Sequence, residues 1–396
     1  MTSTPSEAPA PDSRPQRDAV FTFSYETYQD AVYREMMRPP DRLLSTMMTI
    51  PEVRRLLVVN PYRSLPRAGL RALLQRGPDL VAPERQSLHT PLRLRRHDSI
   101  DVPTLVRQYR AYDRNVHRAA TRADLVRPVV VTTNPVVAGF SPFAWAGPVT
   151  YFGRDDWLSY DARQQYWPAY AAAYDAIARS EIGVVAVSEQ IIDRINPRGP
   201  TAVVPNGVEP SEWLTPQPQT PAWMADLPSP RAVYVGTIDT RVDVAGLHRF
   251  AVDRPDVHIV LVGPVPDPAL VAGLRRLGNL TIHRPVGRAE LVATVRNADL
   301  ALVAHVRSHL TKAMSPLKVF EYLAAGVPVV SIDLPPIRDL SDRVLLVDTV
   351  SDFPEVIDNA LSMGRLAESA RHQFVHDNSW AARHRTVLDV VWRNSG

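Results

Sequence analysis

The residues with the clearest chemical potential lie in one short segment, MSPLKVFEYLAAGVPVVS, which spans residues 314–331. Ser315 is a suitable N-cap for a helix, and Pro316 fits the first helical position. Gly326 suits the position just after a helix, and Pro328 could not continue it. The pattern therefore predicts a helix over residues 316–325. The N-terminus of this helix would present free backbone N–H groups and a partial positive charge, which together favour an anion.

Two charged side chains on this helix extend the predicted anion site. Lys318 lies in the first turn, and Glu321 follows three residues later on the same face. Lys312 lies in the segment that leads to the helix, and Lys312 and Lys318 are the only lysines of the chain. This geometry fits a nucleoside diphosphate, with the diphosphate at the helix start and the ribose hydroxyls on Glu321. The alternative is an ordinary capped amphipathic helix with an exposed Lys–Glu pair.

A second candidate site follows the strand predicted at residues 149–152, in the segment VTYFGRDDW. Asp155 and Asp156 come just after the carboxyl end of that strand, where open α/β sheets bind their ligands. One aspartate could act as the general base for an acceptor hydroxyl, and the other could tune its pKa through like-charge coupling. The alternative is a pair that caps a helix or forms a salt-bridged turn.

Several weaker signals remain open. The Asn-Pro pairs at residues 60–61 and 134–135 each end a predicted strand and are typical of turns. The His97-Asp98 pair could be a base and its orienting partner, but it follows three arginines, so a solvated charged loop is favoured. His305 and His309 lie shortly before the predicted helix and could contact phosphates.

Composition excludes several classes of protein. The chain has 396 residues, a formal net charge of +3 and no cysteine, so disulfides, thiolate metal sites and a cysteine nucleophile are excluded. Between Arg34 and Arg127 there are 19 arginines and nine acidic residues, which favours an anionic acceptor or lipid surface; scattered surface arginines are the alternative. Nucleic acid is not expected, because no stacking or zinc-finger pattern accompanies these arginines.

Short β-branched runs alternate with helical stretches, which predicts parallel sheets with helices on both faces. The alternation stops in a proline-rich segment at residues 214–230 and then starts again. We therefore predict an α/β protein of two doubly wound, Rossmann-like domains that face a central cleft. Its predicted parts are a disordered tail (1–18), a first domain (19–212), a linker (213–230), a second domain (231–378) and a C-terminal helix (379–396).

The individual elements are predicted from the same alternation. Strands are expected at residues 20–24, 56–59, 128–132, 149–152, 184–187, 202–204, 232–235, 258–262, 280–283, 300–304, 328–332 and 344–347. Helices are expected at residues 42–48, 102–120, 165–178, 189–195, 244–251, 268–277, 288–296, 316–325, 353–361 and 379–392.

The segment SPLKVFEYLAAGVPVVS resembles the donor-binding motif of GT-B fold glycosyltransferases, in the style of glycosyltransferase family 4 and related bacterial polysaccharide transferases. Three further segments are similar to that family in the same order: residues 187–188 with 204–208, VYVGTIDTRVD at 233–243, and NADLALV at 297–303. The helix after Ser379 resembles the one that crosses back to the first domain in this family. The resemblance covers residues 180–395 well and the first half loosely.

This resemblance implies a nucleotide-sugar site in the second domain, with Glu321 on the ribose and Lys318 on the diphosphate. The donor-binding residues that it implies are Gly236, Thr237, Arg241, Lys312, Ser315, Pro316, Leu317, Lys318 and Glu321. The chain departs from the family pattern at residues 311–314, where many relatives carry a sugar-contacting glutamate, so those contacts cannot be carried over. For Arg241, the alternative is an exposed ion pair with Asp243.

We therefore expect a glycosyltransferase that moves a sugar from a nucleoside diphosphate sugar, with UDP favoured, to an acceptor hydroxyl. The acceptor would be a glycan, a lipid-linked sugar or a small molecule, and the first domain would bind it. No cofactor and no metal are expected, because the chain has no D-x-D pair and no dinucleotide or P-loop fingerprint. The expected location is cytoplasmic, with contact at the inner face of the membrane as an option. The alternatives are a nucleotide-sugar epimerase and a non-catalytic partner that binds the nucleotide sugar.

Overall fold

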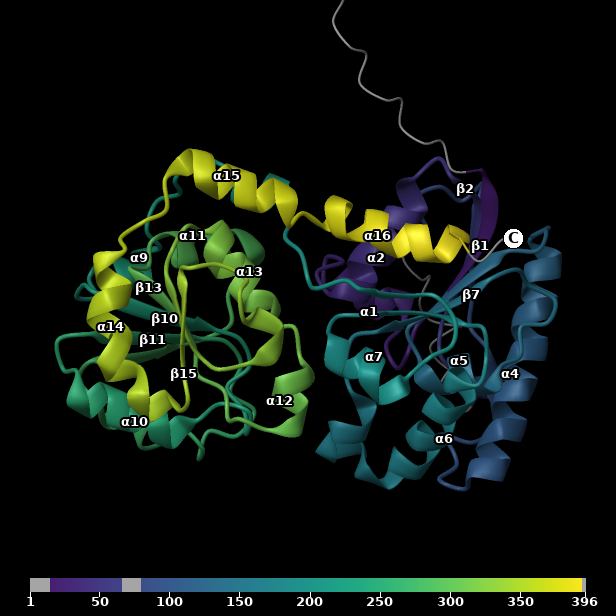
Figure 1. Ribbon diagram of the computed structural model, residues 1–396, viewed down its shortest axis with the longest axis horizontal. Helices are drawn as coiled ribbons and strands as arrows, with labels where there is room; N and C mark the ends of the chain where they lie inside the picture. Colours follow the sequence, from purple (N-terminus) through teal and green to yellow (C-terminus); the bar gives the residue numbers. More distant parts are fainter. Residues whose placement is uncertain (1–14, 66–79, 394–396) are drawn as a thin grey trace, which may run out of the picture.

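The computed structural model describes residues 15–65 and 80–393, and these form two α/β lobes joined by two chain crossings (Figure 1). The first lobe contains a seven-stranded sheet in the order β4-β2-β1-β6-β7-β8-β9. The second contains a six-stranded sheet in the order β12-β11-β10-β13-β14-β15. Neighbouring strands in both sheets run parallel. The predicted fold class, two doubly wound parallel-sheet domains, is therefore confirmed.

The first sheet is built from apolar, β-branched runs that are buried on both faces. Val20 on the inner strand β1 pairs with Leu57 on one side and with Val130 on the other. The strands of this lobe are β1 (Arg17–Thr22), β2 (Val53–Val59), β3 (Arg63–Ser64), β4 (Gln86–His89), β5 (Leu92–Arg93), β6 (Val129–Thr132), β7 (Val149–Gly153), β8 (Gly183–Ala186) and β9 (Thr201–Val203). Its helices are α1 (Tyr28–Tyr33), α2 (Pro39–Thr49), α4 (Val102–Arg122), α5 (Pro135–Phe140), η1 (Trp157–Ser159), η2 (Asp161–Tyr166), α6 (Trp167–Ala178) and α7 (Glu189–Ile195).

The second sheet repeats this plan with shorter strands. Val233 on the central strand pairs with Val260 and with Ala301. The strands are β10 (Arg231–Val235), β11 (His258–Val262), β12 (Leu280–His283), β13 (Leu300–Val303), β14 (Val329–Ile332) and β15 (Val344–Val347). The helices from the linker onward are α8 (Pro210–Trp213), α9 (Ala222–Ala225), α10 (Val244–Asp253), η3 (Leu274–Arg276), α11 (Arg288–Arg296), α12 (His309–Ala313), α13 (Leu317–Ala324), η4 (Pro335–Ile337), η5 (Val350–Asp352), α14 (Phe353–Ser362), α15 (Glu368–Asp377) and α16 (Trp380–Arg393).

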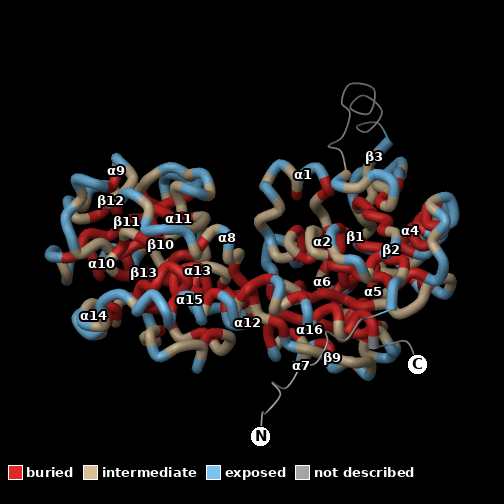
Figure 2. The backbone as a smooth tube through the Cα atoms, turned by 90° about the horizontal axis from the view of Figure 1, so that it is seen from above, coloured by how far each residue is buried: buried red, intermediate tan, exposed pale blue. Residues whose placement is uncertain are grey.

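The two crossings lie beside each other. The backbone amide of Val208, on the way out of the first lobe, donates to the carbonyl of Asn378 at 2.9 Å, and the amide of Trp380 donates back to Val208 at 2.9 Å. After this point α16 lies on the first lobe, where Val387 and Val391 join its buried core (Figures 1 and 2). The last helix therefore belongs to the first lobe, although the whole second sheet precedes it in the chain.

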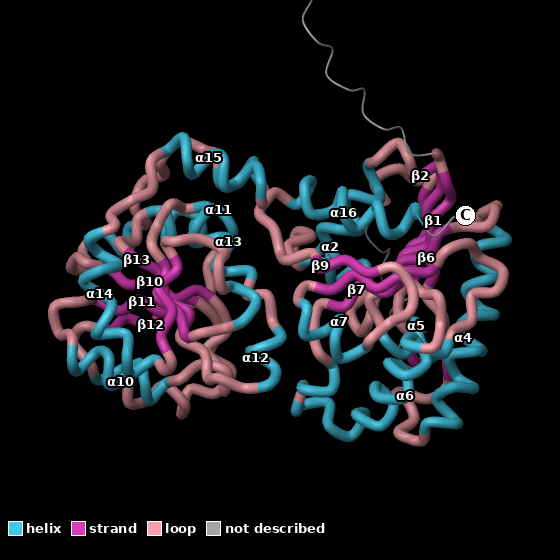
Figure 3. The backbone as a smooth tube through the Cα atoms, viewed as in Figure 1, coloured by secondary structure: helices cyan, strands magenta, loops and turns pink. Residues whose placement is uncertain are grey.

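Most predicted elements are found, but some are wrong or were missed (Figure 3). Residues 268–277 form turns and the short 3₁₀ helix η3 rather than the predicted helix. The edge strand β4 and the helices α1, α5, α12 and α15 were not predicted. The strand β1 begins at Arg17, within the predicted tail, because Asp18 is buried and paired with Arg54 at 2.6 Å. The remainder of that tail, up to residue 14, lies outside the described residues.

No helix in the described ranges combines the length and the apolar content that a membrane crossing requires.

Candidate functional site

The second lobe brings three segments together at the carboxyl edge of its sheet. The first is the loop after β10, where Gly236 has a φ of 142° and its amide donates to the carbonyl of Val262 at 2.9 Å. A Cβ on this residue would stand 3.1 Å from Nζ of Lys318. A glycine is therefore required both by the backbone angle and by the approach of the lysine to the loop. Thr237, the next residue, accepts a hydrogen bond on its carbonyl from the Tyr234 hydroxyl at 3.3 Å.

Lys318, in the first turn of α13, occupies this junction. Its Nζ lies 3.8 Å from the centroid of the Tyr234 ring and 3.2 Å from Nε2 of His305, which follows β13. Burial, reinforced by nearby Arg241, lowers the pKa of Lys318 to about 7. Burial likewise holds the pKa of His305 well below its usual value, with Lys318 and Arg241 adding to the effect. The junction thus gathers the ammonium of Lys318 and the guanidinium of Arg241 beside a neutral histidine.

Arg241 belongs to the loop between β10 and α10 and lies on that side of the junction. Its guanidinium donates to both carboxylate oxygens of Asp239, at 3.0 and 2.8 Å. These bonds raise the pKa of Arg241. The alternative of an Arg241–Asp243 ion pair is wrong, because Asp243 instead caps α10 by accepting from the amide of Gly246 at 2.8 Å.

Glu321 lies one turn further along α13 and is 7% exposed. Its Oε1 accepts from Nη1 of Arg288 at 2.6 Å, whereas its Oε2 accepts no hydrogen bond from the described residues. Arg288 also donates to Glu212 at 2.6 Å, and Glu212 in turn accepts from Arg42 on α2 at 2.6 Å. A continuous chain of four charges therefore runs from the carboxylate of Glu321 to the first lobe. Local sequence patterns could not indicate this chain of charges, since its members come from α2, α8, α11 and α13.

The start of α13 differs in detail from the prediction. Pro316, rather than Ser315, is the N-cap, and α13 begins at Leu317. The predicted cap is wrong because Ser315 is hydrogen-bonded instead to Asn206, at the end of the first lobe. Nδ2 of Asn206 donates to the Ser315 carbonyl at 2.6 Å. The backbone amide of Asn206 also donates to Oγ of Ser315 at 3.3 Å. The predicted anion-binding terminus is thus held directly by the other lobe.

Lys312 was placed with the donor site by prediction. It lies exposed in the last turn of α12. In the described part of the chain its side chain makes no hydrogen bond or ion pair with Lys318, Glu321 or Arg241. The structure therefore does not bring Lys312 into contact with the other predicted donor residues.

Asp155 and Asp156 lie together after β7 but have different surroundings. Asp156 is 3% exposed; it caps η1 through the amide of Leu158 at 3.2 Å and accepts from Oγ of Ser159 at 2.5 Å. Asp155 is more accessible and pairs with Nε of Arg154 at 3.1 Å. The alternative that the sequence left open, a helix cap, therefore describes Asp156.

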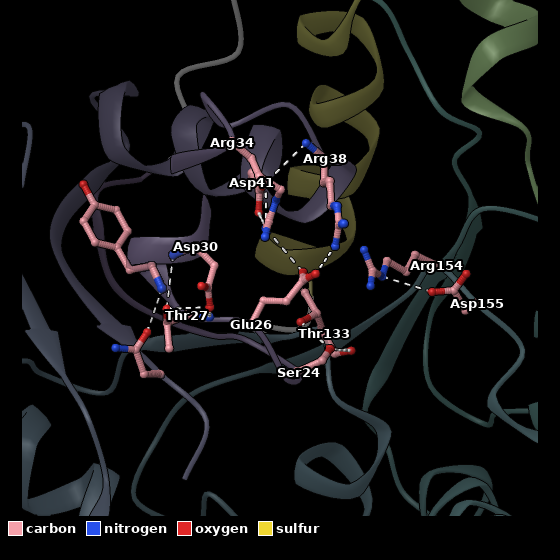
Figure 4. A network of polar contacts seen from close by, with 12 residues as sticks. Ser24, Glu26, Thr27, Asp30, Arg34, Arg38, Asp41, Thr133, Arg154 and Asp155 are labelled. Carbon is pink, nitrogen blue, oxygen red and sulfur yellow. Dashed lines mark hydrogen bonds and ion pairs between the residues drawn. The ribbon is translucent and has the colours of Figure 1, made fainter. Parts of the chain in front are cut away.

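The loop after β7 faces a second polar cluster of the first lobe. Arg154 points toward Arg38, which forms an ion pair with Glu26, and Asp155 lies beyond it (Figure 4). Burial and the neighbouring Arg154 lower the pKa of Arg38. Glu26 also pairs with Arg34 at 3.3 Å. Arginine charge is therefore concentrated at the carboxyl ends of β1 and β7.

The first lobe also contains a pocket of about 760 Å³ at the carboxyl ends of β1, β2 and β4. Asn60, His97 and Asp98 line this pocket, so three residues for which the sequence favoured a turn or a solvated loop belong to one cavity. A second pocket, of about 530 Å³, lies against the outer side of the Arg241 loop and has mostly apolar walls such as Val242 and Leu274. Neither Lys318 nor Glu321 lines that second pocket.

This arrangement defines the class of fold. Solved structures that resemble the chain over nearly its whole length include an α,α-trehalose 6-phosphate synthase from Burkholderia multivorans, with a TM-score of 0.67, 12% identity, and coverage of 95% of this chain and 98% of that one. The lipopolysaccharide outer core galactosyltransferase WaaB gives a TM-score of 0.62 at 14% identity and covers 95% and 99%. The chain has the GT-B fold of these glycosyltransferases, as its sequence predicted.

The second lobe also matches known sequences. Residues 245–389 match the family model described as "Glycosyl transferase-like". A segment of 104 residues is 32% identical to the teichuronic acid biosynthesis glycosyltransferase TuaH of Bacillus subtilis. That match covers 26% of this chain and 26% of TuaH. The predicted resemblance to GT-B glycosyltransferases is thus confirmed, whereas membership of family 4 stays a prediction.

Proposed function

We propose that this protein transfers a glycosyl group from a nucleoside diphosphate sugar to an acceptor hydroxyl. The observation that carries this proposal is the junction of Gly236, Lys318, His305 and Arg241 at the carboxyl edge of the second sheet. It gathers cationic groups around a helix start and a glycine loop, and it contains too little negative charge to satisfy them. A diphosphate would supply that charge, and Glu321 lies one turn deeper on the same helix.

In the reaction we propose, the bond between the anomeric carbon and the diphosphate oxygen breaks, and the acceptor oxygen forms a new bond to that carbon. The diphosphate leaves with additional negative charge, which the ammonium of Lys318 and the guanidinium of Arg241 stabilise. The proton of the acceptor hydroxyl passes to a base. Of the two aspartates after β7, we assign this role to Asp155, because Asp156 is engaged as a cap.

Three finer assignments belong to the same proposal. We propose UDP as the nucleotide, which is supported by structural neighbours named as UDP-forming synthases. We propose a glycan or lipid-linked acceptor handled at the inner face of the membrane, which is supported by the teichuronic acid role in the name of TuaH. Metal-independent transfer remains our prediction, and activity that persists in EDTA would support it.

The first experiment is a thermal-shift screen of the full chain against nucleoside diphosphates, in which binding raises the melting temperature. UDP should stabilise the protein, and Lys318→Met should abolish the shift. Arg249→Gln, which changes an exposed arginine on the outer face of α10, is the matched control and should keep it. Release of UDP from UDP-sugars is then measured. No stabilisation by any nucleoside diphosphate would contradict the proposal.

One observation favours a second candidate, a non-catalytic partner that binds nucleotide sugars. Arg288 already occupies one oxygen of Glu321, and the chain lacks the glutamate that relatives carry at residues 311–314. Binding of UDP without turnover of any UDP-sugar, alone or with acceptors, would favour this candidate. Turnover that Glu321→Ala removes would exclude it. Analysis of the product formed from donor alone separates transfer from epimerisation.

A further inference from the structure

The 760 Å³ pocket of the first lobe combines cationic and aromatic walls. Four arginines line it, and four tyrosines line it as well. The arginines are Arg63, Arg93, Arg96 and Arg163, and the tyrosines are Tyr25, Tyr62, Tyr109 and Tyr166. Such walls suit a sugar, whose apolar C–H face packs on aromatic rings, when that sugar also carries an anionic group.

The charge inside the pocket is not balanced. Asp98 forms an ion pair with Arg93 and also accepts from the Tyr109 hydroxyl at 3.2 Å. Asp30 lies 3.6 Å from Arg63. These are the two carboxylates among the lining residues, and each is already matched to an arginine. The remaining two arginines, Arg96 and Arg163, have no carboxylate partner among the described residues, so the pocket carries an excess of positive charge.

The two unmatched arginines come from different segments of the first lobe. Arg163, on η2, lies with its guanidinium carbon 4.5 Å from the centroid of the Tyr25 ring. Arg96 belongs to the loop after β5, and its carbonyl accepts from Arg93 at 3.3 Å. His97, the next residue, also lines the pocket. The guanidinium of Arg93 in turn lies 5.1 Å from the centroid of the Tyr62 ring. Aromatic and cationic groups therefore alternate around one cavity.

The pocket is connected through aromatic contacts to the loop after β7. The ring of Tyr25 meets Trp157 at a centroid distance of 5.3 Å, and Trp157 meets Tyr160 at 6.2 Å. Trp157 follows Asp155, the proposed base, by two residues in this loop. A ligand in the pocket would thus lie beside the loop that carries the proposed base.

We propose that this pocket binds the acceptor, and that the acceptor is an anionic sugar whose phosphate or carboxylate group is held by Arg96 and Arg163. This inference rests on the proposed glycosyl transfer and specifies its substrate class. The tyrosines contact the sugar ring, and the arginines select the charged group. A neutral sugar would leave both arginines without an anion and would bind more weakly.

The test is calorimetric titration of the full chain with glucose 6-phosphate, glucuronate and neutral glucose, without donor. At least one anionic sugar should bind roughly tenfold or more tighter than glucose, which is the scale of one charged hydrogen bond. The phosphate and carboxylate probes distinguish the two sources of the charge. Equal binding of all three sugars, or no binding by either anionic one, would overturn the inference.

Variants separate this inference from the proposed function. Arg96→Gln and Arg163→Gln should each weaken binding of the anionic sugar roughly tenfold or more and leave glucose binding unchanged. Arg95→Gln, the matched control, alters an exposed neighbour that does not line the pocket and should have no effect. UDP binding should be the same in all three variants. If the wild type binds UDP but does not prefer an anionic sugar, only the inference of an anionic acceptor is refuted. If the wild type does not bind UDP, the proposed function itself is refuted.

Discussion

Binding of a diphosphate should change the protonation of Lys318. In the free protein the pKa of this lysine is about 7, first because it is buried and second because Arg241 is nearby. A bound diphosphate would place two negative charges beside the ammonium and raise this pKa again. Above pH 7, binding must therefore take up a proton from solution.

The size of the effect follows from these two states. At pH 8 a group with a pKa of about 7 is roughly 10% protonated, so recharging it takes up about 0.9 protons for each UDP bound. The affinity for UDP should then fall by about fivefold between pH 7 and pH 8 and by nearly tenfold per pH unit above pH 8, and it should level off below pH 7, where the free lysine is already charged. The terminal phosphate of UDP is ionised at pH 8 and contributes little.

The assay is titration calorimetry with UDP at pH 8 in two buffers of different ionisation enthalpy, because the difference between the two heats gives the number of protons taken up. Lys318→Arg is the control, since a guanidinium stays charged and should reduce the uptake to near zero. Uptake near zero in the wild type, or equal uptake in both proteins, would refute the role given to Lys318.

The depressed pKa also has a consequence for stability. A lysine that must be charged in a buried site destabilises the folded state. This destabilisation is fully present below pH 7 and decreases as the pH rises from 7 to 10.5. Lys318→Met should therefore raise the free energy of unfolding of the free protein at pH 6, by at most about 5 kcal/mol, and by much less at pH 10. Urea unfolding at the two pH values measures this, and an equal effect at both would contradict it.

Four further variants test other parts of the site. Arg288→Met should lower the free energy of unfolding by about 3 to 5 kcal/mol in urea titrations, because it leaves the buried carboxylate of Glu321 without its partner and takes from Glu212 one of its two arginines; a loss below about 1 kcal/mol would show that the charge chain is not structural. Asp156→Ala should lower the free energy of unfolding by about 1 kcal/mol with little change in kcat, whereas Asp155→Asn should lower kcat by about a hundredfold or more; the reverse pattern in unfolding and steady-state assays would exchange the two roles. Gly236→Ala should weaken UDP binding in calorimetry, because the Cβ strains the loop and displaces Nζ of Lys318, and unchanged affinity would place the diphosphate elsewhere.

Much of the fold could be predicted because both sheets are made of parallel strands buried on both faces. Such strands are short apolar runs between polar turns, as in VYV at residues 233–235 or HIVLV at 258–262, and their boundaries are visible in the sequence. The edge strand β4 carries the mixed sequence QSLH, with only Gln86 buried, so it has no such signal. The helix α12 was not predicted because it is only five residues long, which is too short to show a helical pattern in the sequence.

The candidate site was predictable only where its residues are neighbours in the chain. Lys318 and Glu321 share one helix, so their common face follows from helical spacing alone. The partner of Glu321 could not be predicted, because Arg288 lies 33 residues away and is one of many arginines. For the same reason the sequence could not show that Ser315 would form hydrogen bonds with Asn206 instead of capping α13. Such contacts depend on how the lobes meet, which local patterns do not encode.

The return of α16 to the first lobe has a consequence for how the protein is made. When the first lobe leaves the ribosome, the helix that supplies Val387 and Val391 to its core has not been synthesised, and residues 210–379 must follow first. Throughout that interval an apolar strip beside β8 remains uncovered, and it is a place where chaperones or other nascent chains could bind. Completion of the first lobe therefore waits until the second lobe has been synthesised, and a truncation that removes α16 would damage the first lobe although the second lobe lies between them in the chain.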